Sequence, residues 1–302
     1  MNTKICMRLF LIFVLLAPIH AISQDLFVGN DSIPFSFLQK VGTSQTIGGY
    51  PIMNLGNQWG LTYAKTSFST GSASGLPLAN VFAIDIRNKK LFAAIDIQAN
   101  LAQMSMSDWI DEPCKRDDFI WKRSIGGAFK NINCASISHR VNYFVTPTGY
   151  FQQILGSLRS AEVDITPTVV EVEFTRYTNN GRRLKYRIQI NPEEFGVERD
   201  ASNLWGANSW HRAFIQKDKK KTEFIVSLTR WAEEIQNRID NAFEKNQGAF
   251  QGMPEFMSYF NKPKNEDRKS VEERLKNAKD LFDKNLITEK QYNEQVGDIL
   301  NN

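Results

Sequence analysis

Two cysteines, Cys114 and Cys134, have the clearest capacity for chemistry in this chain. A pair of thiols can form a disulfide, hold a metal ion or exchange electrons. No pair of histidines lies nearby to complete a zinc-binding pattern, and the spacing is not the C-x-x-C of redox proteins. We therefore expect a structural disulfide, which contributes roughly 3 kcal/mol to stability when its closed loop is treated by chain entropy.

The stretch 203–216 brings Trp205, Trp210 and His211 close together in sequence. Such a cluster can line a pocket for a sugar or a peptide, or it can seal a helix against a sheet. Both interpretations stay open here. Together with Trp109 and Trp121, these tryptophans also allow carbohydrate or cell-wall binding, provided that two or more of them share one exposed cleft.

Catalytic motifs are absent from the sequence, which has no nucleophile elbow and no H-E-x-x-H. His139 has no obvious serine, cysteine or carboxylate partner, so a structural role is expected. The strand register expected below separates Asp85 from Asp96 by about 13 Å along one face. Glycosidase carboxylates need about 5–9.5 Å, so these two are expected to be solvated. No catalytic residue, cofactor or metal site is predicted. An envelope hydrolase with dispersed residues, such as a carboxylate pair or a serine with His139 or His211, stays open.

Residues 1–23 have the pattern of a signal peptide. Two basic residues precede the uncharged apolar run 9–19, and small residues at 21 and 23 suit cleavage before Gln24. The run is too short to cross a membrane, so we expect export to the periplasm or medium, with no membrane span in the mature chain. The two remaining cysteines favour a disulfide in such an oxidising compartment.

Composition narrows the class of partner. The formal net charge is +4 and the hydrophobic fraction is 42%, which is ordinary for a globular protein. Cleavage would remove two positive charges, so neither nucleic acid nor an anionic lipid surface is indicated. The expected organisation is an exported domain at 24–250, a linker at 251–268 and a small C-terminal unit at 269–302.

The domain is predicted to be an α+β fold, in which a mostly antiparallel sheet of hairpins is packed by a long amphipathic helix. The helix is expected over 222–246, where apolar residues recur every three or four positions. A first hairpin joins 81–86 to 91–97 through a two-residue turn at Asn88-Lys89. Its register sets Phe82, Ile84 and Ile86 opposite Ile95, Ala93 and Leu91.

A second hairpin joins 168–178 to 182–190. A three-residue loop that ends on Gly181, in the left-handed conformation, keeps apolar and polar residues on separate faces. In that register Glu173 meets Arg187 on the solvated face. The opposite face then pairs Val170, Val172 and Phe174 with Ile190, Ile188 and Tyr186.

The C-terminal unit is predicted to be a helical hairpin. Ser270 with Glu273, and Thr288 with Gln291, match the capping box that begins a helix. Two helices in about thirty residues bury little surface, so their apolar side chains are expected to seek a partner. The predicted interaction residues are Leu275, Leu281, Phe282, Leu286, Ile287, Tyr292 and Leu300.

This segment resembles the bacterial short C-terminal domain family called SHOCT. The resemblance rests on these apolar positions and on the bend Leu286-Ile287-Thr288-Glu289, while Asn285 stands where the family usually has glycine. It covers about a tenth of the chain. It implies a bacterial source and a role in oligomerisation. Nucleic-acid binding has also been suggested for the family, but export makes that partner unexpected here.

The functional expectation is a non-enzymatic exported protein whose body binds a partner or ligand. Its C-terminal hairpin is expected to drive self-association or to bind another envelope protein. The hydrolase and the tryptophan-based carbohydrate binder stay open as alternatives.

Overall fold

The computed structural model describes most of the body and single positions of the C-terminal unit. The described residues are 24–42, 44–53, 55, 59–69, 75–102, 113–125, 131–144, 150–178, 181–200, 202, 204–260, 275–276, 279, 282–283, 288–289, 292–293 and 296. The predicted signal peptide lies outside them, as do residues 261–268 of the predicted linker. No helix within these residues is both long and apolar enough to cross a membrane.

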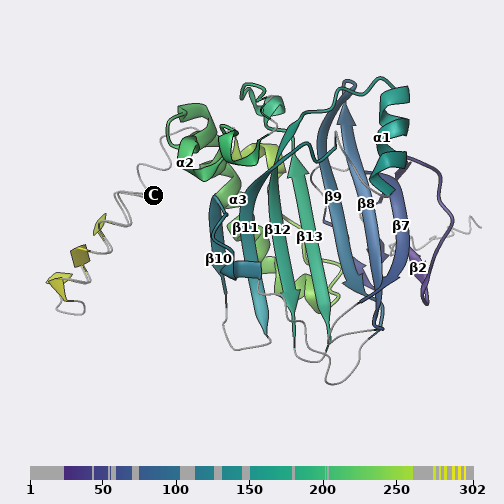
Figure 1. Cartoon of the computed structure of the whole chain (residues 1–302). Coiled ribbons are helices and arrows are strands. Elements are labelled where there is room, and N and C mark those ends of the chain that lie inside the picture. Colours follow the sequence, from purple (N-terminus) through teal and green to yellow (C-terminus); the bar gives the residue numbers. More distant parts are fainter. Residues whose placement is uncertain are drawn as a thin grey trace, which may run out of the picture.

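An antiparallel sheet of eight strands forms the centre of the described body (Figure 1), with strand order β10-β11-β12-β13-β9-β8-β7-β4. The strands are β4 (Gln39–Lys40), β7 (Gly60–Phe68), β8 (Pro77–Arg87), β9 (Lys90–Asn100), β10 (Trp121–Ser124), β11 (Ile132–Val141), β12 (Thr168–Tyr177) and β13 (Arg183–Ile190). Two small sheets contain β1 (Gln24–Asp25), β5 (Gln45–Ile47) and β6 (Tyr50–Pro51), and β2 (Phe27–Val28) with β3 (Asp31–Ser32). The predicted mixture of helices with a large antiparallel sheet is confirmed.

Helices lie on both sides of the sheet. In Figure 1, α1 (Tyr150–Ser160) is in front of the β7–β9 side, and α3 (Lys219–Phe243) runs behind β11 and β12. The short α2 (Arg212–Ile215) precedes α3. Four 3₁₀ turns complete the described elements: η2 (Pro113–Lys115), η3 (Pro192–Phe195), η4 (Trp205–Ala207) and η5 (Phe256–Tyr259).

Side-chain alternation on the strands produces two different faces. We call the face toward α3 the helix face; there Phe174 contacts Trp231 of α3 edge-on, with ring centroids 5.9 Å apart. Burying such aromatic pairs supplies much of the stabilisation of a core. α3 begins three residues before the expected range because Asp218 caps it, accepting bonds from the amides of Lys220 and Lys221.

The second hairpin has the predicted register. Phe174 pairs with Tyr186, and Glu173 pairs with Arg187. Gly181 adopts a φ of 78°, the left-handed conformation that the three-residue loop requires. The turn residues Asn179 and Asn180 lie outside the described residues.

The predicted register of the first hairpin is wrong beyond its first two pairs. Asn88 and Lys89 have φ angles of 50° and 60°, so the two-residue turn is present. A β-bulge between Asp85 and Ile86 then shifts the pairing by one residue, which places Phe82 opposite Asp96. A one-residue shift exchanges the faces, so Asp85 and Asp96 lie on opposite sides of the sheet.

The expectation that these two acids are solvated is also wrong. Asp85 is 2% exposed and forms a 2.8 Å ion pair with Arg87, whose guanidinium lies 3.5 Å from the ring centre of Phe92. A buried carboxylate needs such a partner, because desolvation disfavours an unpaired charge. Asp96 is ion-paired on the other face.

The predicted disulfide between Cys114 and Cys134 is confirmed. It ties η2 to β11, where Cys134 is buried. The short edge strand β10, which pairs with β11, lies inside the closed loop. The crosslink therefore fixes the outer edge of the sheet.

Candidate ligand-binding face of the sheet

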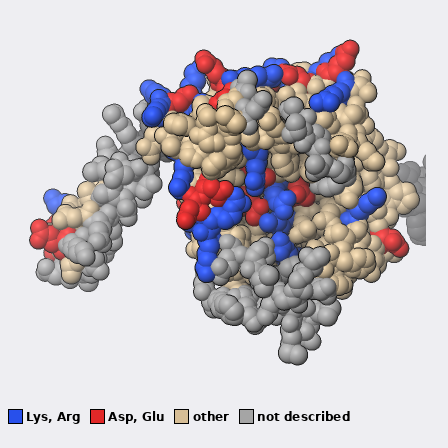
Figure 2. All heavy atoms as spheres, in the orientation of Figure 1, with Lys and Arg blue, Asp and Glu red and all other residues tan. Residues whose placement is uncertain are grey.

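Ionised side chains converge on the face of the sheet opposite α3, which we call the charged face. Strand alternation and register bring them together on four neighbouring strands. Figure 2 shows acidic and basic side chains gathered in the middle of this face. The six members are Asp96 on β9, Arg140 on β11, Glu171 and Glu173 on β12, and Lys185 and Arg187 on β13.

Glu171 is bound on both carboxylate oxygens. Arg140 donates from Nε and Nη2 to Oε1, at 3.0 and 2.7 Å. The side-chain amide of Gln189 donates to Oε2 at 3.0 Å. The Glu171 side chain is almost fully buried, and buried polar atoms need hydrogen-bond partners, which these bonds supply.

Arg187 connects Glu173 to Asp96. Its Nη1 donates to Oδ2 of Asp96 at 2.9 Å, and its Nε donates to Oε2 of Glu173 at 3.1 Å. The other oxygen of Glu173 accepts from Lys185 at 2.9 Å and from the Thr175 hydroxyl at 3.1 Å. One guanidinium thus joins three adjacent strands.

The carboxylates lie deeper than the guanidiniums. The side chains of Glu171, Asp96 and Glu173 are 2%, 12% and 15% exposed, whereas those of Arg140 and Arg187 are 35% and 31% exposed. A molecule that approaches this face therefore meets positive charge first.

Burial and neighbouring charges shift the pKa values of Asp96 and Glu173 in opposite directions. Burial raises the pKa of Asp96, and the Arg187 guanidinium opposes that effect without cancelling it. Burial also acts to raise the pKa of Glu173, but Lys185 and Arg187 outweigh it and hold that pKa below its ordinary value. Burial, reinforced by Asp96 and Glu171, raises the pKa of Tyr143 and keeps its hydroxyl protonated.

The predicted cluster of Trp205, Trp210 and His211 is divided by the fold. Trp205 is 37% exposed and meets the His211 ring edge-on at 4.6 Å. Trp210 is fully buried beside Phe224 of α3. It therefore seals the helix against the core, and Trp205 and Trp210 do not share an exposed cleft. Trp121 is in β10 and packs against the core, while Trp109 lies outside the described residues.

His139 completes the aromatic contact around Trp205. The two rings are stacked with centroids 5.1 Å apart, and His139 Nε2 lies 3.1 Å from the Trp205 carbonyl oxygen. Because a carbonyl can only accept, Nε2 must carry the proton, and the buried Nδ1 has no partner among the described residues. The Nδ1 of His211 accepts from the Ala213 amide. Within the described residues, neither His139 nor His211 is hydrogen-bonded to a serine or a carboxylate. A histidine-based catalytic site therefore gains no support.

A hollow of about 550 Å³ lies on the helix face. Phe195, Phe224 and Phe260 line it and contact one another, with ring centroids 4.3–5.3 Å apart. At its rim, the Lys220 ammonium is 3.4 Å from the Gly196 carbonyl oxygen. This aromatic hollow adjoins the last residue of the described body.

The described positions of the C-terminal unit include Phe282 and Tyr292, whose rings stack with centroids 5.0 Å apart. The Tyr292 amide donates to the Thr288 carbonyl at 2.9 Å, which is a helical hydrogen bond. Leu275 is also described and half-buried. The other predicted interaction residues, Leu281, Leu286, Ile287 and Leu300, lie outside the described residues.

Of the charged face, only the pairing of Glu173 with Arg187 was predictable from the sequence. Arg140 and Asp96 come from strands whose pairing partners are distant in sequence. The available signal was the alternation of charged residues with apolar ones in both β12 and β13. Among the described residues, no group of three or more histidine, cysteine, aspartate or glutamate side chains could hold a metal ion.

Comparison with known proteins returned no match among family models, curated protein sequences or solved structures.

Burial lowers the pKa of His139 below 6.5, the value for a free histidine, and Arg140 and His211 add to that effect against Asp118 and the Trp205 carbonyl. The unfolded chain therefore binds the proton more readily than the folded protein. The contribution of His139 to the unfolding free energy is fully present above about pH 6.5 and is lost as the pH falls below that value.

We expect His139→Gln to reduce the loss of unfolding free energy between about pH 7.5 and about pH 5.5, measured by urea denaturation. Ile154→Val, on the buried side of α1, serves as a control that lowers the unfolding free energy without changing its dependence on pH. If the unfolding free energy changes equally with pH in all three proteins, the lowered pKa of His139 is contradicted.

Proposed function

We propose that this chain is a non-enzymatic binding protein that holds a polar ligand on the charged face of its sheet. The observation that carries the proposal is the placement of two partly exposed guanidiniums over buried carboxylates. Burying ionised groups is costly, and apolar side chains of similar size often stabilise a fold as well. Such a network is therefore better explained by recognition than by stability.

Binding explains the site better than catalysis does. Asp96 and Glu173 have pKa values shifted apart, which is the pattern of an acid–base pair and favours an envelope hydrolase as the second candidate. However, Arg187 donates to both of them. A substrate would have to compete with the guanidinium for the oxygens that it contacts, so these carboxylates are better placed to orient Arg187 than to transfer protons.

Export is part of the proposal. The signal-peptide pattern at 1–23 supports it, and the disulfide is compatible with an oxidising compartment. Cleavage near Ser23-Gln24 would leave the sheet domain as a periplasmic or secreted protein.

The C-terminal unit is proposed to be a SHOCT-like helical hairpin that self-associates. Two capping boxes and the stacking of Phe282 on Tyr292 support a hairpin. The small size of the unit supports association, because a hairpin of this length buries too little apolar surface to be stable alone.

Binding on the charged face can be tested with three probes that differ in charge: glucose, spermidine and glycerol 3-phosphate. We expect at least one to raise the thermal unfolding temperature of the protein that begins at Gln24. We expect Arg140→Gln to remove that increase, because it takes a guanidinium from the face.

Arg238→Gln is the matched control, since Arg238 is an arginine of similar exposure in an ion pair on α3. It should leave the temperature increase unchanged. If no probe stabilises the protein, or if both variants respond as the parent does, the charged face is not the binding surface.

Self-association can be tested by light scattering coupled to size exclusion, comparing the protein that begins at Gln24 with a truncation that ends at Lys264. We expect an oligomer for the full protein and a monomer for the truncation. Monomers in both cases would contradict self-association and would point to docking of the hairpin on the body, where the aromatic hollow is the nearest described surface, or on another protein.

A further inference from the structure

We infer that the ligand of the charged face carries an oxyanion, a carboxylate or phosphate group, which Arg140 and Arg187 bind together. This inference rests on the proposed function and names the chemical class of its ligand. The class follows from the donors that remain, the spacing of the guanidiniums and the charge that surrounds them.

Each guanidinium has donors left over after its ion pair is made. Arg140 uses Nε and Nη2 to hold Glu171, and Arg187 uses Nε and Nη1 to hold Glu173 and Asp96. Within the described part of the chain, Nη1 of Arg140 and Nη2 of Arg187 donate to no side chain or backbone carbonyl. Arginine forks match the oxygens of carboxylates and phosphates.

The two guanidiniums are anchored to the same strand, on the same face of the sheet. Each is anchored to a glutamate of β12, and Glu171 and Glu173 are two residues apart, about 7 Å along the strand. Burial acts to lower the pKa of Arg140, but Glu171 outweighs it and holds that pKa above its ordinary value. The Arg187 charge works against this rise, which reflects a repulsion between the two guanidiniums. An oxyanion between them would relieve that repulsion.

The surrounding charge disfavours the other ligand classes. Both oxygens of Glu171 and of Glu173 already accept from protein donors, so a cation would have to compete with those donors for the same oxygens. Arg183 is a fourth cation, next to Lys185 on the same side of β13. Burial lowers the pKa of Lys185 against the opposing charge of Glu173, and the charges of Arg187 and Arg183 add to that lowering.

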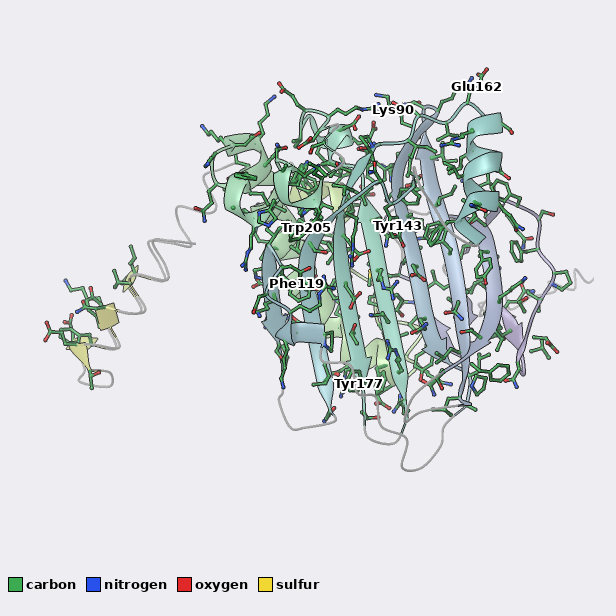
Figure 3. The ribbon with its side chains drawn as sticks, in the orientation of Figure 1. Lys90, Phe119, Tyr143, Glu162, Tyr177 and Trp205 are labelled. Carbon is green, nitrogen blue, oxygen red and sulfur yellow. A yellow bond between two sulfur atoms is a disulfide. The ribbon has the colours of Figure 1, made fainter. Side chains whose placement is uncertain are left out.

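A neighbouring group can complete the recognition. Figure 3 places Tyr143 over the middle of the sheet near β9, and its protonated hydroxyl is a donor there.

The direct test is a titration with glycerol 3-phosphate, followed by NMR of the arginine Nε–Hε signals, with glycerol as the uncharged probe. We expect the signals of Arg140 and Arg187 to shift in a saturable manner with glycerol 3-phosphate and not with glycerol. Arg140→Lys keeps the charge and the ion pair but loses the planar fork, so the affinity should fall about tenfold. Arg238→Lys is the control and should bind as the parent protein does.

The outcomes separate the inference from the proposed function. If glucose or spermidine binds in an Arg140-dependent manner and glycerol 3-phosphate does not, the charged face is a binding surface but the oxyanion class is wrong. If glycerol 3-phosphate shifts other signals and leaves Arg140 and Arg187 unchanged, both assignments fail. If Arg140→Lys binds as tightly as the parent, Arg140 does not contact the anion.

Discussion

The pairing of buried charges across β11, β12, β13 and β9 is the constraint on which the charged face depends. Arg187 holds Glu173 and Asp96, while Arg140 and Gln189 hold Glu171. An unpaired carboxylate at this depth would cost several kcal/mol, so every member needs its neighbours. The carboxylates hold the guanidiniums in place and leave part of each exposed. The same pairing that satisfies the buried carboxylates therefore also positions the two guanidiniums on which the proposed anion binding rests.

The rest of the fold maintains this arrangement from the other side. α3 packs against the opposite face of β11 and β12 through contacts such as Trp231 with Phe174, which keep those strands in one layer. The disulfide fixes the outer edge at β11. The β-bulge at Asp85 shifts β8 against β9, so that Phe82 lies opposite Asp96 and the apolar cluster beneath α1 borders the charged residues.

Sequence pattern predicted the local elements and missed the long-range ones. The second hairpin was predictable because its glycine turn and its alternation agree on one register. The first was not, because a bulge inserts a residue without any change in composition. Arg140 and Asp96 could not be placed beside Glu171 and Arg187, since that requires the order of strands far apart in sequence. Similarly, spacing could not reveal that Trp210 enters the core while Trp205 stays at the surface five residues away.

A double-mutant cycle between Glu173 and Arg187 tests the central claim that these charges depend on one another. The unfolding free energies of the parent, Glu173→Gln, Arg187→Gln and the double variant would be measured by urea denaturation. Mutual dependence predicts a coupling energy above about 1 kcal/mol, with the double variant more stable than the two single losses would give if they added. Additive losses would show that each charge is satisfied independently, and would contradict the account of the face as one paired network.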